Sequence, residues 1–229
     1  LVFDTGYGEP DGYSNGSRQI APFLRAAGYR RIDALVVSHG DADHAGGASD
    51  LLASLPAAQI MSSVPQRFAG ASRCRTGQRW TWDGVAFRFL HPDGEAWHGN
   101  NGSCVLQITA GEHSLLLTGD IEAPAEQALL NQVGMGLRAR VLVAPHHGSA
   151  GSSTPDFIAA VRPELVLFPM GYANHFGFPR PKVVRRYERA GAMLARTDRG
   201  GALIVDLEPG SALSLRSYRA EEPRIWRTR

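Results

Sequence analysis

The chain has 229 residues, a formal net charge of +2 and 43% hydrophobic residues. This hydrophobic content is ordinary for a globular core, and no apolar run reaches the roughly 18 residues that would predict a membrane span. Composition therefore excludes a membrane-spanning segment within this sequence. The first residues, LVFDTG, already read as a strand, so we expect the chain to be part of a longer protein.

Short apolar runs predict strands, and they alternate with amphipathic segments that predict helices. The expected strands, in chain order, are 1–4, 32–38, 58–63, 85–90, 103–110, 114–120, 140–146, 164–170, 202–207 and 212–218. The expected helices are 17–28, 45–55, 123–133, 154–161 and 180–191. Because residues 80–120 read as a run of hairpins, a simple strand–helix alternation fits poorly. We predict one α/β domain over 1–229, with two sheets covered by helices.

Four of the predicted strands end in aspartate or histidine. They are the strands in the stretches FDTG, VVSHGDADH, LLLTGD and VLVAPHHGS. Ligands bind outside the carboxyl ends of strands in open α/β sheets. We therefore expect these four strand ends to converge on one site.

The richest of these stretches has the pattern H-x-D-x-D-H, formed by His39, Asp41, Asp43 and His44. In an extended turn, side chains at i, i+2 and i+4 point the same way, so the first three residues share a face. His44 begins the next helix and is rotated toward a second position. A helix cap explains one aspartate here, but not two aspartates with two histidines. Because imidazole and carboxylate bind divalent metals, we predict metal ligands here.

The other strand ends complete the predicted site. Asp120 has a carboxylate that can bridge two metals. Of the adjacent pair in APHHGS, His146 is the preferred ligand, and His147 is assigned to substrate contact or orientation. A catalytic role is thus assigned to His147 and, besides its metal contact, to Asp43. Asp4 is expected to orient the H-x-D-x-D-H turn, because an aspartic protease would need a second such motif.

The cysteines and the remaining histidines are less informative. Cys74 and Cys104 are separate thiols in a reducing compartment and can pair in an oxidising one. Because both flank predicted strands, we predict a disulfide. His175 lies in a glycine-rich loop where it can contact substrate, whereas His91 is expected to be structural and His113 to be solvated.

In their order along the chain, Asp4, the stretch SHGDADHAGG, Asp120 and His146 resemble the motifs of the metallo-β-lactamase superfamily, with Asp41 in place of the usual middle histidine. The resemblance is closer to the C-terminal domain of ComEC-type competence proteins. Its supporting stretches cover most of the chain and include LVFDTG, SNGSRQIAPFLRAAGYRRIDALVVSHGDADHAGG, NNGSCVLQITAG, LLLTGDIE, APHHGS and FPRPKVVRRY. The resemblance implies an αββα sandwich of two mixed sheets flanked by helices, with a site for two divalent metal ions.

The resemblance also implies a function. ComEC-type proteins carry a membrane channel that passes one DNA strand inward, and this domain would be the DNase that degrades the other strand. It would face the periplasm or the cell exterior and hold the DNA backbone without reading sequence. The alternatives are another ester hydrolase of the superfamily, such as a choline-phosphate esterase or a lactonase, and a non-catalytic DNA-binding module.

One departure from the superfamily pattern affects the metal. A further histidine ligand has no clear counterpart, and the matching region reads NNGSC. Asn101 or Ser103 is expected to serve there as a weak ligand or substrate contact. A carboxylate at Asp41 and the missing imidazole favour Mn²⁺ over Zn²⁺ for activity, although Zn²⁺ binds more tightly in general.

Overall fold

The computed structural model describes residues 1–9 and 12–221. The chain divides into two compact units. Unit 1 comprises Leu1–Gln78 and Phe89–Val105, and unit 2 comprises Arg79–Arg88 and Leu106–Arg229. The chain therefore leaves unit 1 for one short hairpin before it returns and then continues into unit 2.

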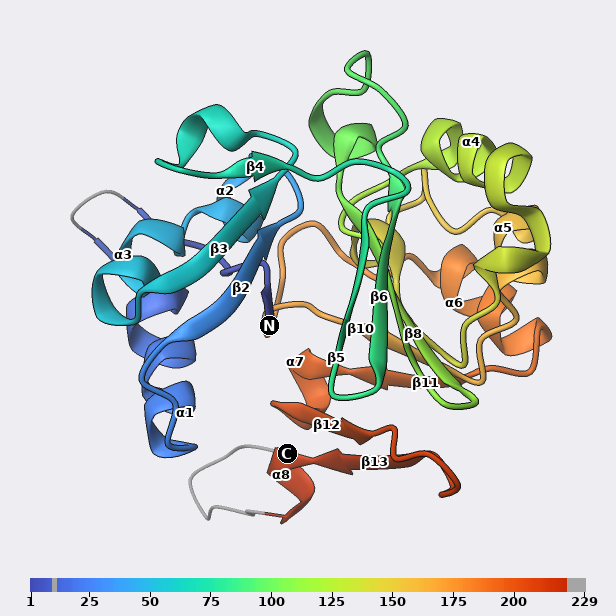
Figure 1. Ribbon diagram of the computed structural model, residues 1–229. Helices are drawn as coiled ribbons and strands as arrows, with labels where there is room; N and C mark the ends of the chain where they lie inside the picture. Colours follow the sequence, from blue (N-terminus) through green and yellow to red (C-terminus); the bar gives the residue numbers. More distant parts are fainter. Residues whose placement is uncertain (10–11, 222–229) are drawn as a thin grey trace. The chain divides into compact units, whose positions relative to one another are not determined.

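Unit 1 is built on a four-stranded sheet in the order β1-β2-β3-β4, and every described strand pair in it is parallel. The strands are β1 (Val2–Phe3), β2 (Ile32–Val37), β3 (Ala57–Ser62) and β4 (Ser72–Arg73). The helices are η1 (Gly16–Ile20), α1 (Ala21–Ala26), α2 (Ala42–Ala45), α3 (Ala48–Ser54), η2 (Pro65–Arg67) and η3 (Gly99–Gly102). Figure 1 shows α1 and α3 beside β2 and β3.

The core of unit 1 lies between β2 and these helices. Leu35 and Val37 of β2 pack with Leu51 of α3, and all three side chains are fully buried. The glycines that follow the polar turn allow this close approach. A Cβ at Gly46 would lie 2.3 Å from the Ala42 oxygen and 2.5 Å from the nitrogen of Gly8. The GG pair is thus required by packing behind the turn.

Unit 2 contains most of a seven-stranded sheet in the order β11-β10-β9-β8-β7-β6-β5. The strands are β5 (Arg79–Trp82), β6 (Val85–His91), β7 (Val105–Ala110), β8 (His113–Leu117), β9 (Val141–Val143), β10 (Leu165–Phe168) and β11 (Met193–Arg196). The pairs from β8 to β11 are parallel, whereas β5–β6 and β7–β8 are antiparallel. A separate antiparallel pair consists of β12 (Leu203–Asp206) and β13 (Ser214–Ser217).

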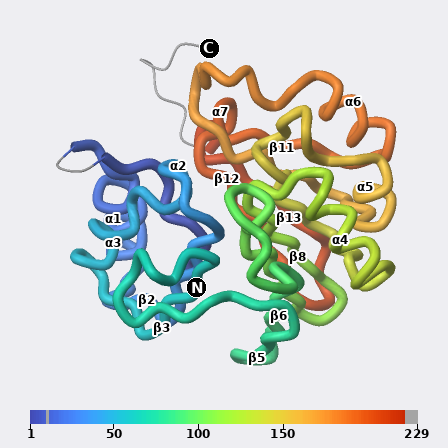
Figure 2. Tube along the Cα trace, turned by 90° about the horizontal axis from the view of Figure 1, so that it is seen from above, coloured from blue at the N-terminus to red at the C-terminus, as the bar shows by residue number. Residues whose placement is uncertain are grey.

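Helices and the β12–β13 pair pack on this sheet. The helices of unit 2 are α4 (Ala123–Val133), η4 (Gly134–Leu137), η5 (Pro145–Gly148), α5 (Pro155–Val161), α6 (Pro181–Arg189), α7 (Thr197–Gly200) and α8 (Tyr218–Glu221). Both views show α4, α5 and α6 gathered beside the sheet (Figures 1 and 2), where Tyr187 of α6 packs edge-on against Phe168 of β10. Leu215 of β13 and Val205 of β12 pack against Val141 and Leu165 of the sheet.

The structure confirms the α/β class with helices flanking several sheets, and it corrects details. The sheet of unit 1 is parallel, so only the larger sheet is mixed, and β12–β13 form a third sheet. The strands β4, β5 and β11 were not predicted individually, because none of them contains a continuous apolar run. His113 is buried, not solvated, and its Nε2 bonds to the Glu208 oxygen at 3.0 Å. Within the described residues, no helix has both the length and the apolar character that crossing a membrane requires.

Candidate metal centre

The H-x-D-x-D-H turn follows β2 directly and leads into α2. Asp41 occupies the N-cap position with extended backbone, but its side chain makes no capping hydrogen bond. A cap therefore does not account for this aspartate. Its carboxylate instead lies 3.5 Å from Nε2 of His39, whose side chain is almost fully buried.

Asp4 holds the start of this turn. Its Oδ1 accepts a hydrogen bond from the Ser38 amide at 2.6 Å, and its Oδ2 accepts one from the Ser38 hydroxyl at 2.8 Å. The same Oδ2 lies 2.7 Å from Nδ1 of His44. Because a carboxylate only accepts, Nδ1 of His44 carries the proton and Nε2 presents its lone pair. This is the contact that the predicted orienting role of Asp4 requires.

His39 and His44 share one arrangement. Nδ1 of His39 lies 3.1 Å from the Ser38 hydroxyl. The Nε2 atom of each ring lies beside a neighbouring carboxylate: Asp41 for His39, and Asp43, at 3.8 Å, for His44. We call His39, Asp41, Asp43 and His44 the first ligand group. It belongs entirely to unit 1.

Asp120, His146 and His147, which we call the second ligand group, belong to unit 2. Asp120 follows β8 and is 4% exposed, and both histidines lie in η5 after β9. The two Nε2 atoms face opposite oxygens of Asp120, at 3.7 Å for His146 and 3.5 Å for His147. Their Nδ1 atoms are also engaged, with Glu122 at 3.0 Å for His146 and with the Pro169 carbonyl at 2.7 Å for His147.

The chemistry of these donors fits a divalent metal ion. In all four histidines Nδ1 is held and Nε2 lies 3.5–3.8 Å from a carboxylate oxygen. These separations are too long for hydrogen bonds. They are close to the ~3.4 Å that separates two ligand atoms each ~2.1 Å from a tetrahedral metal. Imidazole with its second nitrogen fixed by a hydrogen bond is the usual form of a histidine ligand.

The second ligand group has an unusual backbone. His146 and His147 both adopt left-handed conformations, with φ of 47° and 51°. Such conformations are uncommon outside glycine and are found where function requires them. Gly148 follows, and a Cβ there would lie 2.6 Å from Cβ of Pro179. The Arg180 amide donates to the Gly148 oxygen at 2.9 Å, so the segment before α6 packs directly on the histidine turn.

The weaker candidates are placed as follows. Ser103 is fully buried, and its hydroxyl donates to the Asn100 oxygen at 2.7 Å. The carbonyl of Asn101 accepts from His91 Nε2 at 2.7 Å. His175 lies in an exposed loop of unit 2 against the ring of Phe176. The ligand or substrate roles predicted for Asn101, Ser103 and His175 therefore stay predictions.

Three residues of the site were missed or misjudged from sequence. Ser38 and Glu122 hold ligand-type histidines, and each lies within two positions of a predicted ligand. Ser38 lies next to His39 and Glu122 lies two residues after Asp120, and this closeness in sequence was the only indication that they support the site. Phe178 packs edge-on against His146 with the ring centroids 5.6 Å apart. Nothing in the sequence pattern distinguished Phe178 from other aromatic residues.

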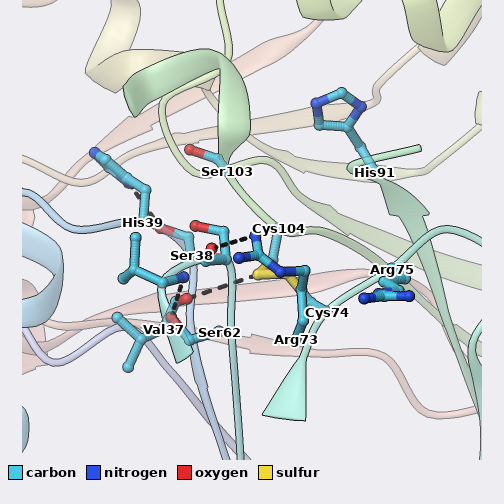
Figure 3. Close-up of a disulfide and its surroundings, with 12 residues drawn as sticks. Val37, Ser38, His39, Ser62, Arg73, Cys74, Arg75, His91, Ser103 and Cys104 are labelled. Atoms are coloured by element: carbon cyan, nitrogen blue, oxygen red, sulfur yellow. Dashed lines mark hydrogen bonds between the residues drawn. A yellow bond between two sulfur atoms is a disulfide. The ribbon is translucent and has the colours of Figure 1, made fainter. Parts of the chain in front are cut away.

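Cys74 and Cys104 form a disulfide in unit 1, with their Cα atoms 6.0 Å apart. Figure 3 shows the bond beside Ser38 and the end of β2. The Cys104 amide donates to the Ser38 oxygen at 2.9 Å, and the Cys74 amide donates to the Ser62 oxygen at 3.1 Å. The bond is thus tied by backbone hydrogen bonds to the residue that precedes His39.

Residues 1–171 match the family profile described as the Metallo-beta-lactamase superfamily. The chain therefore belongs to this superfamily and has its hydrolase fold. Among solved structures, Igni18, described as a novel metallo hydrolase from Ignicoccus hospitalis, has a TM-score of 0.51 and 18% identity. The match covers 81% of this chain and 80% of Igni18. At 18% identity, it shows a similar fold only.

The similarity to competence proteins is also confirmed. The chain is 41% identical over 222 residues to Competence protein ComA of Neisseria gonorrhoeae, which covers 96% of this chain and 31% of that protein. It is 30% identical over 207 residues to ComE operon protein 3 of Bacillus subtilis, covering 83% and 26%. The chain thus spans less than a third of the length of these relatives.

Proposed function

We propose that the chain is a metal-dependent DNA phosphodiesterase that acts in DNA uptake and degrades the strand that is not imported. The observation that carries this proposal is the common arrangement of the four histidines, each with Nδ1 held and Nε2 beside a carboxylate. Membership of a hydrolase superfamily and similarity to competence proteins supply the substrate class.

Both ligand groups would serve the same metal ions, since the family profile spans both. By the superfamily resemblance, Asp43, His44, Asp120 and one of the two histidines of η5 would hold one ion, and His39, Asp41 and Asp120 would hold a second. Bound divalent ions would lower the pKa of water and offset charge on the phosphoryl oxygens. The mixed nitrogen and oxygen donors suit Mn²⁺ or Zn²⁺, and the carboxylate at Asp41 favours Mn²⁺ for activity.

Both histidines of η5 are ligand candidates, because Nδ1 of each ring is held and Nε2 of each faces Asp120. Nδ1 of His147 is held by the Pro169 carbonyl at 2.7 Å. Nδ1 of His146 lies 3.0 Å from the Glu122 carboxylate, the same arrangement that Asp4 makes with His44.

A basic groove of about 380 Å³ in unit 2 supports a DNA substrate. Its lining includes Arg79 and Arg88, which lie directly opposite each other on β5 and β6. Like charges in this position destabilise a sheet, and within the described residues neither guanidinium contacts a carboxylate. DNA phosphates would offset this repulsion without sequence specificity.

The cellular setting is part of the same proposal. The chain would be one domain of a longer membrane protein and would work with its channel and its other domains, because each relative is more than three times longer than its matched part. A disulfide persists in oxidising compartments, which supports a position facing the periplasm or the cell exterior.

The test is cleavage of single- and double-stranded DNA by metal-free protein supplied with Mn²⁺, Zn²⁺ or Mg²⁺, beside Asp120→Ala. We expect cleavage only with added metal and only by the wild type. Binding should weaken steeply with salt, because phosphate contacts release counterions. Hydrolysis of a choline-phosphate ester or a lactone without DNA cleavage would favour the other ester hydrolases. Salt-dependent DNA binding without any hydrolysis would favour a binding module.

A further inference from the structure

The loop between β10 and α6, residues 169–180, exposes large aromatic side chains. Tyr172 is 77% exposed and Phe176 is 55% exposed. The proposed chemistry uses neither of them. Grouped apolar side chains at the surface of a protein commonly mark a binding site.

The loop is built to hold Phe176 outward. The side chain of Asn174 closes a turn, since its Nδ2 donates to the Phe178 oxygen and its Oδ1 accepts from the Phe178 amide, both at 2.9 Å. The Gly177 amide also donates to the Asn174 oxygen, at 3.2 Å. Phe176 lies within this closed turn, so its exposure is fixed by three hydrogen bonds.

The aromatic rings form a ladder that ends at the second ligand group. Phe176 stacks on Phe178, with the ring planes 16° apart and the centroids 5.6 Å apart. The His175 ring also lies against Phe176, with the centroids 3.9 Å apart, so a base would stack on the part of Phe176 that these two rings leave exposed. Phe178 in turn packs against His146. The guanidinium of Arg180 lies 5.6 Å from the Phe178 ring centre. All of these residues belong to unit 2.

The charge around the ladder is positive. Residues 169–185 include Arg180, Lys182 and Arg185, all exposed, and contain no aspartate or glutamate. Exposed π faces flanked by cations are how proteins bind single-stranded nucleic acid, because each base stacks on a ring while cations hold the backbone. A duplex buries its base faces and offers none of them to a ring.

We propose that unpaired bases of single-stranded DNA stack on a platform formed by the exposed rings of this loop, Phe176 and Tyr172, and that Phe178 supports Phe176 from the side of His146. This inference rests on the proposed function and specifies its substrate: a single strand, bound by its bases as well as its phosphates. The preference holds for any base, because every base has a π face.

The test is equilibrium binding of a fluorescein-labelled 12-nucleotide single strand, measured by anisotropy in EDTA so that no strand is cut. We expect Phe176→Ala to bind about tenfold more weakly than wild type, and Phe176→Trp to bind like wild type. An oligomer of tetrahydrofuran abasic residues with the same number of phosphates should bind equally to wild type and Phe176→Ala. The matched control is Phe23→Ala in α1, which removes an aromatic side chain that is 66% exposed.

Equal affinity of wild type and Phe176→Ala for the normal strand would overturn the platform. So would an equal loss for the abasic oligomer or for duplex DNA, because neither presents unpaired bases. The measurement is independent of catalysis. A protein that cuts no DNA with any metal, yet loses base-dependent binding in Phe176→Ala, would disprove the proposed nuclease and leave the platform intact. Equal thermal unfolding of the variants checks their folding.

Discussion

The two ligand groups expose the same kind of donor atom, the Nε2 of an imidazole ring, but they are built in different ways. The first comes from six consecutive residues after β2, and its neighbour Asp4 fixes it through Ser38 and His44. The second joins residues from the ends of β8 and β9, and two histidines occupy left-handed backbone to reach one carboxylate. For the first group the left-handed residue is the supporting Asp4, with φ of 60°, whereas in the second group it is the histidines themselves, which pack on the segment beside Gly148.

The difference also affects how each group depends on single residues. In the first group each histidine has its own carboxylate, Asp41 or Asp43. In the second group both histidines share Asp120. Loss of the Asp120 carboxylate should therefore weaken metal binding more than loss of the Asp41 or Asp43 carboxylate.

The largest expected effect comes from this comparison. Asp120→Ala should lower metal affinity and DNA cleavage by about a thousandfold or more, and Asp41→Ala by about tenfold, because Asp41 is 59% exposed and faces one histidine. Metal content by mass spectrometry and calorimetric titration with Mn²⁺ and Zn²⁺ measure the affinities. Equal losses in the two variants would show that Asp120 is not shared between two ions.

The next effect concerns the covalent support of the first group alone. A Cys74→Ser, Cys104→Ser double variant should lose about 3–4 kcal/mol of unfolding free energy, the chain-entropy value for a loop of 30 residues. Urea unfolding with and without dithiothreitol measures the difference. The reductant should destabilise the wild type and leave the double variant unchanged. No response of the wild type would mean that its thiols are free.

A smaller effect is expected when the carboxylate that holds a histidine is replaced, Asp4 in the first group and Glu122 in the second. Asp4→Asn should weaken metal binding about 10–100-fold, because it removes the charged partner of His44. Glu122→Gln, the matched change beside His146, should weaken metal binding as much as Asp4→Asn if His146 is the ligand, and should leave it within about threefold if His147 is the ligand. The first outcome would agree with the sequence-based choice of His146.

The smallest effect tests the packing behind the second group. Glu126 is fully buried and accepts hydrogen bonds from the Ser153 and Thr154 amides. Burial raises its pKa above the usual 4.5. The folded state therefore keeps the proton to higher pH than the unfolded state, so this residue's contribution to stability falls as pH rises from about 4.5 through the raised value.

Urea unfolding in EDTA from pH 4 to pH 8 checks this contribution. The stability of wild type relative to Glu126→Gln should fall with rising pH by roughly 1.4 kcal/mol for each unit by which the folded pKa is raised. Glu188→Gln, on the exposed side of α6, is the control and should show no such trend. A difference between wild type and Glu126→Gln that does not change with pH would contradict the account.

Sequence reasoning performed best where chemistry is local. The turn from His39 to His44 was singled out as a candidate metal site because four ligand-type residues share six positions, and β2 was found because its run is apolar. The parallel pairing of β1 to β4 was not predicted, since a two-residue strand such as β4 carries no periodicity. His113 was misjudged because a hairpin turn is usually exposed. Here the segment around Glu208, far along the chain, covers it, and the Glu208 carbonyl oxygen bonds to Nε2 of His113.

The choice between His146 and His147 shows a different limit. Adjacent identical residues differ only in what holds their rings, and those partners, Glu122 and Pro169, are 24 and 22 positions away. No spacing rule contains that information. The aromatic ladder could not be predicted from spacing either, because the exposure of Phe176 depends on the turn that Asn174 closes with Phe178.

The disulfide has one more consequence, because the loop that it closes contains the β5–β6 hairpin, which belongs to unit 2. A protease cut at the Asp83–Gly84 turn would interrupt the polypeptide, yet Cys74 would lie on one fragment and Cys104 on the other. The nicked protein would migrate as one band without reductant and as two bands with it. In an oxidising compartment, the disulfide would therefore keep the two fragments joined even after the backbone is cut.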